Sequence, residues 1–495
     1  MKHLGENRTT VKRGWWLIGL ILSLTCCFYL IYLIYDKWEN NPTIMSFVNE
    51  ETPINQIPFP AVTICPVVKS YSHNQTKIIE KLIHYRSLNE TEYKSFSYMN
   101  LFCDQFPPPN DWFVNKSENF SFNDNFFNQQ EFYNFTLNIT DIHPLISCSW
   151  RNRILFHCLD LIDIILTDDG VCYSFNLLSP KNIYKDNVQN YFFDRINHRY
   201  SRESNRGTYA RRASFSGVSQ SLDIGLYVNN NFNDPLCRFF WSLQGFKVIL
   251  HTPSTVPRLR QEHFYLPANT AVIAAIKPVV VSTSENFKKF SPEKRNCYFE
   301  NENPLRYFKE YTQSNCELDC LTRYTLYWCR CVAFYMPMDN ITTICSSLNR
   351  KCLHEAEEIM FSNKLIINPN ANADEKPPQC HCLPSCRDLS YEVETSSIKY
   401  KPVILSKFDD SGRNYSYSRL VIYFKRNHFT ASNRHELYEI TEFIGKVFVL
   451  LLLLGLFTGF AVLSFMKIFY VLTVRLFNIG SYGQWSGNRD EENNL

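Results

Sequence analysis

Two long apolar stretches, one near each end of the chain, set the strongest limit on the fold. The first covers residues 15–35, WWLIGLILSLTCCFYLIYLIY, and the second covers residues 447–474, interrupted by Lys467. A helix needs roughly 20 apolar residues to cross a bilayer, so each stretch is long enough to span it. The sequence therefore predicts two transmembrane helices, with residues 36–446 between them on one side of the membrane.

The charges beside the first stretch predict its orientation. Four basic residues precede it, namely Lys2, Arg8, Lys12 and Arg13. Because basic flanks stay in the cytoplasm, residues 1–14 and, after the second span, residues 475–495 are expected there. The chain is thus predicted to be a multi-pass plasma-membrane protein with both termini cytoplasmic. Its net charge of +3 is small and gives no reason to expect a nucleic-acid partner.

The cysteines and the glycosylation sequons support this topology. Of 18 cysteines, Cys26 and Cys27 lie in the first apolar stretch, and the others lie between Cys65 and Cys386. A dense, even set of this kind is typical of disulfides in an oxidising compartment. Predicted glycosylation sites in the same region are Asn74, Asn89, Asn115, Asn119, Asn134, Asn138, Asn340 and Asn414. We therefore expect residues 36–446 to be extracellular.

Closely spaced cysteines mark residues 297–386 as a distinct lobe. Neighbouring cysteines in a C-x-C pattern point to opposite faces of an extended chain, so each is expected to bond elsewhere. Two C-x-C pairs that face each other would form a ladder of disulfides. The alternative is a zinc site at Cys380-His381-Cys382, but an exported domain favours disulfides. The sequence HEAEE at residues 354–358 lacks the second histidine of a zinc protease and is interpreted as a solvated helix, so no metal is expected.

The remaining patterns predict an α+β extracellular domain. Strand-like runs rich in β-branched and aromatic residues are VCYSFNL, LDIGLYV, FKVILHTP, AVIAAIKPVVVSTS and LVIYFKRNHF. Helical patches, PLRYFKEYTQ and ELDCLTRYTLYW, lie among the cysteines of the lobe. Residues 110–138, rich in Asn and Phe, are interpreted as a surface excursion.

Several motifs together resemble the degenerin/epithelial sodium channel family, in its insect pickpocket branch. They are IPFPAVTICP, GVCYSFN, RNCYFENENPLRYFKEYTQSNCELDC, CRCVAFYMP, CHCLPSCRDLSYEVE and GLFTGFAVLS. The resemblance covers nearly the whole chain in order. It implies a trimeric, two-span cation channel, of a kind often blocked by amiloride. The extracellular domain would form a clenched hand of palm, finger, knuckle, β-ball and thumb, the thumb being residues 297–386.

The resemblance also implies disulfide pairs. The thumb pairs would be Cys297–Cys386, Cys316–Cys382, Cys320–Cys380, Cys329–Cys352 and Cys331–Cys345. The palm and finger pairs would be Cys65–Cys172 and Cys148–Cys158. The two cysteines that remain, Cys103 and Cys237, are expected to bond to each other.

In the family, the second span lines the pore and is interrupted at a Gly-x-Ser belt that selects cations. The matching residues are Gly459, Phe460 and Ala461, so alanine stands where serine is usual. Lys467 stands where the family usually has a glutamate, and it shares a helix face with Ser464. Lys467 either faces the pore, where three copies would repel cations, or lies at the membrane boundary and extends to the lipid headgroups.

Two polar features of the extracellular region are open to more than one interpretation. Asp168-Asp169 is either a proton-sensing or calcium-binding pair or a plain turn. Arg211-Arg212 is either a protease-processing site or a solvated loop. The family's cytoplasmic His-Gly gating motif is not found before the first span, and a truncated gene model is the favoured explanation.

The functional prediction is a sodium-permeable channel subunit, of a sensory kind, without enzymatic activity or cofactor. Phosphate-loop and serine-hydrolase motifs are missing from the sequence, which argues against an ecto-enzyme. The alternative is a non-conducting regulatory or receptor subunit of a heterotrimer, favoured by Lys467, Ala461 and the missing N-terminal His-Gly motif. Related subunits, sodium ions and the lipid bilayer are the expected partners, and a heterotrimer is preferred over a homotrimer.

Overall fold

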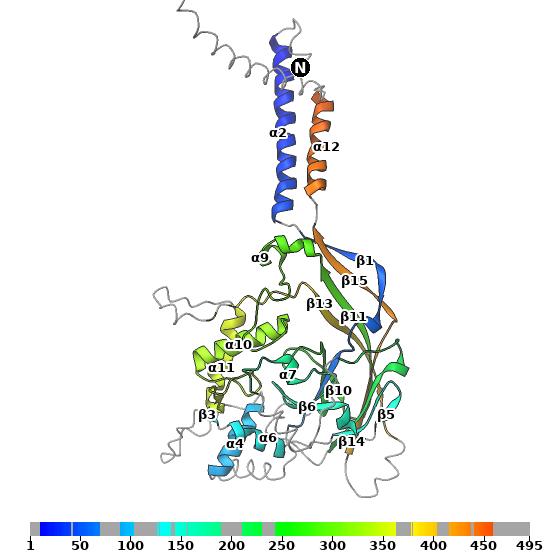
Figure 1. Cartoon of the computed structure of the whole chain (residues 1–495), viewed down its shortest axis with the longest axis vertical. Coiled ribbons are helices and arrows are strands. Elements are labelled where there is room, and N and C mark those ends of the chain that lie inside the picture. Colours follow the sequence, from blue (N-terminus) through cyan, green and yellow to red (C-terminus); the bar gives the residue numbers. More distant parts are fainter. Residues whose placement is uncertain are drawn as a thin grey trace, which may run out of the picture. The chain divides into compact units, whose positions relative to one another are not determined.

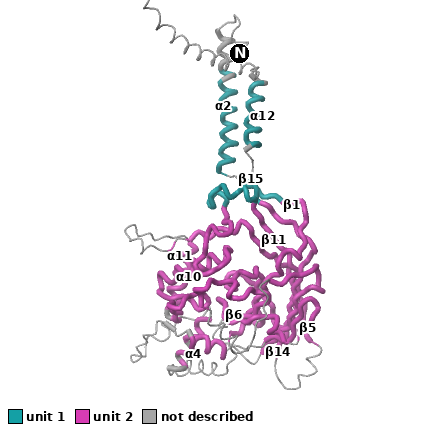
Figure 2. The backbone as a smooth tube through the Cα atoms, in the orientation of Figure 1, with its two compact units in different colours: residues 1–46, 284–295, 434–495 teal, residues 47–283, 296–433 magenta. Residues whose placement is uncertain are grey.

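The computed structural model describes residues 10–40, 43–69, 90–102, 126–127, 129–139, 144–155, 157–189, 210–229, 243–362, 378, 380–402, 415–436 and 440–458. The chain forms two compact units. The first comprises residues 1–46, 284–295 and 434–495, and the second comprises residues 47–283 and 296–433 (Figure 2).

The helices and strands follow each other along the chain as labelled in Figure 1. The helices are α2 (Thr10–Asn40), α4 (Glu90–Phe102), α6 (Gln129–Ile139), α7 (Pro180–Ile183), α9 (Pro292–Arg295), α10 (Gln313–Cys329), α11 (Arg350–Ser362) and α12 (Ile440–Thr458). The strands are β1 (Thr43–Pro53), β2 (Ala61–Pro66), β3 (Phe126–Phe127), β4 (Leu145–Trp150), β5 (Arg153–Leu155), β6 (Ile162–Thr167), β7 (Gly170–Phe175), β8 (Leu222–Asn229), β9 (Gly245–His251), β10 (Phe264–Pro267), β11 (Thr270–Thr283), β12 (Ile344–Cys345), β13 (Asp388–Lys399), β14 (Tyr415–Phe424) and β15 (His428–Glu436).

The first unit is built around α2 and α12, which pack against each other. The indole of Trp38 stacks on the ring of Phe443, with the ring centroids 5.2 Å apart. Large apolar side chains on α2 are exposed, among them Leu22 at 70% and Phe28 at 67%. Within the described part of the chain, the segment Ile21–Asn40 of α2 is the helix long and apolar enough to cross a membrane.

Polar contacts connect the short segment 284–295 to other parts of the first unit. The Lys289 ammonium lies 2.6 Å from a Glu436 carboxylate oxygen, and Lys294 pairs with Glu39. The backbone amide of Ser284 donates to the carbonyl of Arg434 at 3.0 Å. The segment 284–295 is therefore joined both to the end of α2 and to the strand that precedes α12.

Two sheets form the framework of the second unit. The larger has eight strands in the order β1-β15-β11-β14-β8-β4-β5, with β13 paired to β11 off this path. The smaller has five strands in the order β10-β9-β2-β7-β6. β11 runs parallel to β14 and antiparallel to β13, whereas the pairs within the smaller sheet are antiparallel. The predicted strand core is confirmed, since the five strand-like runs contribute β7, β8, β9, β11 and β14.

One of the two predicted helical patches is wrong. ELDCLTRYTLYW lies within α10, but PLRYFKEYTQ is not helical before Gln313. The carbonyl of Tyr307 accepts a hydrogen bond from the amide of Lys185. The amide of Tyr307 donates to the Asp319 carboxylate. Because these tertiary partners hold the backbone in a non-helical conformation, the local helix propensity does not decide its conformation.

The interpretation of residues 110–138 as a surface excursion is also wrong where the structure describes them. α6 buries Phe132 completely, and Leu137 is 3% exposed. The Phe132 ring packs against the rings of Phe102 and Phe334. Within this Asn-rich stretch, residues 129–139 form an amphipathic helix. Its buried side chains recur at helical spacing, and the asparagines lie between them.

The core of the second unit is centred on Phe59, in the IPFPAVTICP motif. Its ring lies between Trp150 of β4, Phe175 of β7 and Phe424 of β14, with centroid distances of 4.7, 6.0 and 5.3 Å. These three rings come from both sheets. Phe59 therefore joins the sheets through edge-to-face aromatic packing.

Asn176, the last residue of GVCYSFN, holds the backbone around Phe59. It has a left-handed backbone with φ of 61°, which asparagine adopts more readily than most residues. Its side-chain amide donates to the Phe59 carbonyl at 2.6 Å and accepts from the Arg211 amide at 2.6 Å. The Arg211 carbonyl in turn accepts from the Phe59 amide at 2.8 Å. The Arg211 and Arg212 side chains remain exposed, which fits a solvated basic loop.

Replacing Phe59 with alanine is expected to lower the free energy of unfolding by about 3–5 kcal/mol, because it leaves a cavity between the sheets. Thermal unfolding of the detergent-solubilised full chain measures the effect. Phe215→Ala serves as the control, since that ring is 48% exposed and its loss should change little. Equal unfolding midpoints for the two variants would contradict the central role of Phe59.

Candidate functional site

The Asp168-Asp169 pair forms the two-residue turn between β6 and β7. Thr167 and Gly170 are paired across this turn, and Gly170 has a φ of 100°, in the region that favours glycine. The Thr167 hydroxyl accepts from the Asp169 amide at 3.2 Å and lies 3.0 Å from the sulfur of Cys172. The plain-turn interpretation describes the backbone correctly, but the turn is buried rather than solvated.

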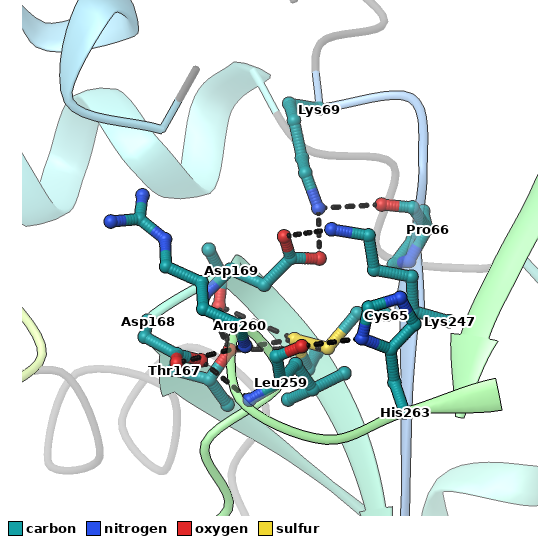
Figure 3. Close-up of polar contacts among 12 residues, drawn as sticks. Cys65, Pro66, Lys69, Thr167, Asp168, Asp169, Lys247, Leu259, Arg260 and His263 are labelled. Carbon is teal, nitrogen blue, oxygen red and sulfur yellow. Dashed lines mark hydrogen bonds and ion pairs between the residues drawn. A yellow bond between two sulfur atoms is a disulfide. The ribbon is translucent and has the colours of Figure 1, made fainter. Parts of the chain in front are cut away.

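The carboxylate of Asp169 is held by two lysines (Figure 3). One oxygen lies 2.5 Å from the ammonium of Lys69, and the other lies 2.8 Å from that of Lys247. Asp169 is 2% exposed, and the lysine side chains are 10% and 15% exposed, so the triad is largely shielded from water. Lys69 follows β2 and Lys247 lies in β9, so the triad connects three neighbouring strands of the smaller sheet.

Among the described residues, the carboxylate of Asp168 pairs with no lysine and instead accepts backbone hydrogen bonds. The amides of Leu259 and Arg260 donate to its two oxygens at 2.9 and 3.1 Å. Figure 3 shows the loop that carries these amides crossing beside the hairpin. His263 lies at the end of the same loop, with its Nδ1 atom 2.7 Å from the Leu259 carbonyl oxygen.

The two carboxylates therefore have pKa shifts of opposite direction. Burial raises the pKa of Asp168, because desolvation outweighs the two amide hydrogen bonds. Burial also favours the neutral form of Asp169, but the ammonium groups of Lys69 and Lys247 outweigh it and hold its pKa below the usual range. Asp169 is thus the charged member of the pair.

This arrangement acts as a structural clamp. All four carboxylate oxygens already have partners from the protein, which argues against calcium binding by the pair. The described residues contain no group of three or more His, Cys, Asp or Glu side chains able to hold a metal ion. The hairpin is therefore fastened on one side to β2 and β9 and on the other to the loop at residues 259–260.

Disulfides fasten the thumb segment, residues 297–386. The structure joins Cys297–Cys386, Cys316–Cys382, Cys320–Cys380, Cys329–Cys352 and Cys331–Cys345. It also joins Cys65–Cys172 and Cys148–Cys158. These are the pairs that the resemblance implied. Neither cysteine of Cys380-His381-Cys382 is left as a thiolate for zinc.

The helix α10 sets the geometry of this ladder. Cys316 and Cys320 lie one turn apart and face Cys382 and Cys380, so the partner segment runs antiparallel to the helix. The helix ends at Arg330, whose left-handed backbone, with φ of 60°, separates its two cysteine neighbours. Those neighbours bond to different partners, as the C-x-C pattern predicts. α11, which carries one of these partners, lies beside α10 (Figure 1).

Several predicted site residues lie outside the described part of the chain. They are Gly459, Phe460, Ala461, Ser464, Lys467, Cys103, Cys237, Asn74, Asn89, Asn115, Asn119 and Asn414. α12 ends at Thr458, immediately before the predicted belt. Three predicted glycosylation sites are described and exposed, namely Asn134 and Asn138 on α6 and Asn340. His354 and Glu358 are both exposed on α11, as expected for a solvated helix.

Comparison with known proteins identifies the family. A family model described as "Amiloride-sensitive sodium channel" matches residues 1–471. The chain belongs to this family.

Relatives of the amiloride-sensitive sodium channel family align along almost the whole chain. Pickpocket protein 28 of Drosophila melanogaster is 26% identical over 504 residues, covering 96% of this chain and 76% of the relative. Sodium channel protein Nach of Drosophila ananassae is 26% identical, covering 95% and 83%. Acid-sensing ion channel 1A of Danio rerio is 22% identical, covering 94% and 83%.

Family membership confirms the resemblance to the degenerin/epithelial sodium channels and their pickpocket branch. It also supports three coarser predictions: membership of a family of ion channels, a plasma-membrane location, and a disulfide-rich, mostly β extracellular domain. Family members assemble as oligomeric channels, in line with the expected subunit partners.

Sequence reasoning singled out Asp168-Asp169 but missed its partners. Lys69 and Lys247 are distant from the pair in sequence and are brought to it by strand pairing between β2, β9 and β7. The sequence did hold one sign of a buried ion pair, because Lys247 interrupts the otherwise apolar strand FKVIL. The amides of Leu259 and Arg260 have no signal in the sequence, since any residue except proline supplies a backbone amide.

Replacing Asp169 with asparagine is expected to lower the free energy of unfolding by about 3 kcal/mol or more, because it removes the buried negative charge that pairs with two largely shielded ammonium groups. The unfolding midpoint of the full chain at pH 7 measures this. Asp186→Asn is the matched control. That carboxylate is 99% exposed and pairs with Lys309 at 3.3 Å, and such surface pairs contribute little.

The same variant tests the direction of the Asp169 pKa shift. A folded-state pKa below the unfolded value of about 3.9 stabilises the protein above that value, and this stabilisation is lost as the pH falls through the folded-state pKa. Asp168 has the opposite sign and is present in both proteins. Wild type should therefore lose stability more steeply than Asp169→Asn below about pH 4. Parallel curves of stability against pH for the two proteins would contradict the lowered pKa of Asp169.

Proposed function

We propose that the chain is one subunit of a trimeric, sodium-permeable cation channel of the plasma membrane, with a sensory role. It crosses the membrane twice, at residues 15–35 and 447–474, and both termini are cytoplasmic. Residues 36–446 are extracellular, with residues 297–386 as the thumb. The observation that carries the proposal is the match of the channel family over residues 1–471.

Features of the first unit support the two-span topology. α2 and α12 lie side by side and expose apolar side chains, as helices in contact with lipid do. The basic residues before α2 favour a cytoplasmic N-terminus. The disulfides of the second unit favour an oxidising, extracellular location for the chain between the two helices.

The proposed pore continues from α12 into the predicted belt at Gly459, Phe460 and Ala461. Backbone carbonyls in such a belt replace part of the hydration shell of the ion, so the exchange of serine for alanine leaves the selecting groups in place. Ser464 and Lys467 follow toward the cytoplasmic side on the same helix face. A lysine in this position opposes the passage of cations.

The size of that opposition favours a heterotrimer. With about 10 Å between charges and an effective dielectric near 20, each lysine raises the energy of a passing monovalent cation by about 1.7 kcal/mol. Three copies add about 5 kcal/mol, whereas one copy in a heterotrimer adds a third of that. A non-conducting regulatory subunit is the second candidate function, and Lys467 and Ala461 are the observations that favour it.

Expression of this chain alone is expected to give surface protein with little sodium current. Co-expression with pickpocket protein 28 is expected to change the size or the selectivity of the amiloride-sensitive current. Whole-cell recording, with surface labelling of the glycosylated chain, measures both. Surface protein that leaves the current of the co-expressed relative unaltered would overturn the proposal of a shared channel.

Changing Lys467 to glutamate is expected to raise the sodium current of the chain expressed alone by about tenfold or more, because it replaces three repulsive charges with attractive ones. Lys467→Arg is the matched control, since it keeps the positive charge. Equal currents from the two variants, at equal surface levels, would place the side chain away from the ions, at the lipid headgroups.

A further inference from the structure

One disulfide of the thumb ladder is open to the solvent on one side. The Cys320–Cys380 bond joins the middle of α10 to the segment that leads into β13. Cys320 is 1% exposed, whereas Cys380 is half-buried. A molecule from the solvent therefore reaches this bond through Cys380.

A guanidinium group lies against the sulfur of Cys380. The Nη2 atom of Arg323 on α10 donates to the Cys380 Sγ atom at 3.4 Å. The Nε atom of the same guanidinium lies 3.2 Å from a carboxylate oxygen of Asp319, which holds the group in place. The Arg323 side chain is 33% exposed and that of Asp319 is 2% exposed, so the positive member of the pair is the one that faces the solvent.

The other described disulfides lack this combination of exposure and charge. Three of them have both cysteines buried, namely Cys65–Cys172, Cys297–Cys386 and Cys331–Cys345. Three others have one half-buried cysteine, namely Cys158, Cys352 and Cys382. Within the described part of the chain, no basic side chain donates a hydrogen bond to the sulfur of any of these three half-buried cysteines.

A fixed positive charge beside a half-buried disulfide favours attack by an anionic thiol. The nucleophile in thiol–disulfide exchange is the thiolate, and its rate of attack depends on access to the sulfur. A neighbouring cation raises the local concentration of anions, so it accelerates exchange with a thiol that carries further negative charge. Arg323 and the exposure of Cys380 meet both conditions at one bond.

We propose that Cys380 is a site of reversible S-thiolation by anionic low-molecular-weight thiols of the glutathione type. The thiolate attacks Sγ of Cys380 and forms a mixed disulfide there, while the bond to Cys320 breaks. The electron pair of that bond leaves with Cys320, which takes a proton from water. The incoming thiol is oxidised and Cys320 is reduced, so the exchange requires no other oxidant or reductant. Attack by the Cys320 thiolate on the mixed disulfide reverses it.

Arg323 would also stabilise the mixed disulfide once it has formed. A glutathione moiety on Cys380 carries carboxylates, and the exposed part of the guanidinium is available to pair with one of them. Such charge-assisted hydrogen bonds are stronger than neutral ones. The modified state would thus keep the cation satisfied after the sulfur that it contacts has changed its partner.

The exchange would loosen one connection within the second unit without opening the whole ladder. Cys316–Cys382, one helical turn away, would still join α10 to the segment before β13. That segment continues through Cys386 into β13, which pairs with β11 along its length. Thiolation of Cys380 would therefore remove one of two bonds between the middle of α10 and the chain that enters the larger sheet.

The test exposes the full chain in detergent to reduced glutathione at low ionic strength and fixed pH. After an acid quench and alkylation of free thiols, mass spectrometry of the peptides locates each product. The first product should carry glutathione on Cys380 and an alkylated Cys320, with the other described disulfides intact. A first adduct at any other cysteine would overturn the proposal. The readout does not depend on ion conduction, so this failure is distinguishable from failure of the proposed function.

Variants of Arg323 test the role of its charge. Arg323→Gln should slow glutathione exchange at Cys380 by about threefold or more, and should not slow exchange with cysteamine, which is cationic. Arg323→Lys should exchange with glutathione nearly as wild type does. Lys351→Gln is the matched control, since this lysine is 89% exposed and adjoins the half-buried Cys352. Equal glutathione rates for wild type and Arg323→Gln would contradict the role assigned to the guanidinium.

The wild-type chain keeps the test decisive if Arg323→Gln does not fold. Raising the ionic strength from about 0.01 M to about 1 M shortens the screening length from about 30 Å to about 3 Å. Glutathione exchange at Cys380 should then slow by about threefold relative to exchange with 2-mercaptoethanol, whose thiolate carries no further charge. An unchanged ratio of the two rates would mean that electrostatic attraction has no part in the reaction.

Discussion

The packing of Phe59 between the two sheets, with the side chain of Asn176 bonded to its backbone, is the interaction on which the second unit depends. The Phe59 ring contacts residues from β4, β7 and β14, so its removal would take away the packing that joins the two sheets. β2 starts two residues after Phe59 and leads to Lys69, while β7 runs from the Asp168-Asp169 hairpin to the residue before Asn176. The geometry of the hairpin clamp therefore follows from the same junction.

The loop at residues 252–263 connects the hairpin clamp to α10. The amides of Leu259 and Arg260 bind the Asp168 carboxylate, and a few residues earlier the amide of Val256 donates to the side-chain oxygen of Asn315. Asn315 of α10 fastens this loop to the disulfide-bonded helix. A change in the position of α10 would consequently alter the hairpin, because both are bonded to the same stretch of backbone.

Much of this architecture could be predicted from the sequence, for reasons that are local. Apolar runs near both ends, β-branched strands and the C-x-C spacing each follow from short-range chemistry. What could not be predicted depends on tertiary partners. Residues 304–312 have a helical composition, yet hydrogen bonds to Lys185 and Asp319 hold Tyr307 in a non-helical backbone. The ion pairs of Asp169 likewise depend on tertiary structure, since strand pairing brings Lys69 and Lys247 to it. The belt and Lys467 lie beyond Thr458, so their roles rest on the family pattern.

Asn134 and Asn138 lie one helical turn apart on the exposed side of α6, whose opposite side is buried against Phe102 and Phe334. Oligosaccharides attached at both positions would cover the same strip of surface. Such a strip is too bulky and too hydrated to serve as a contact between protomers. The subunits of the proposed channel would then meet through other faces of the molecule, leaving this helix directed toward the surrounding fluid.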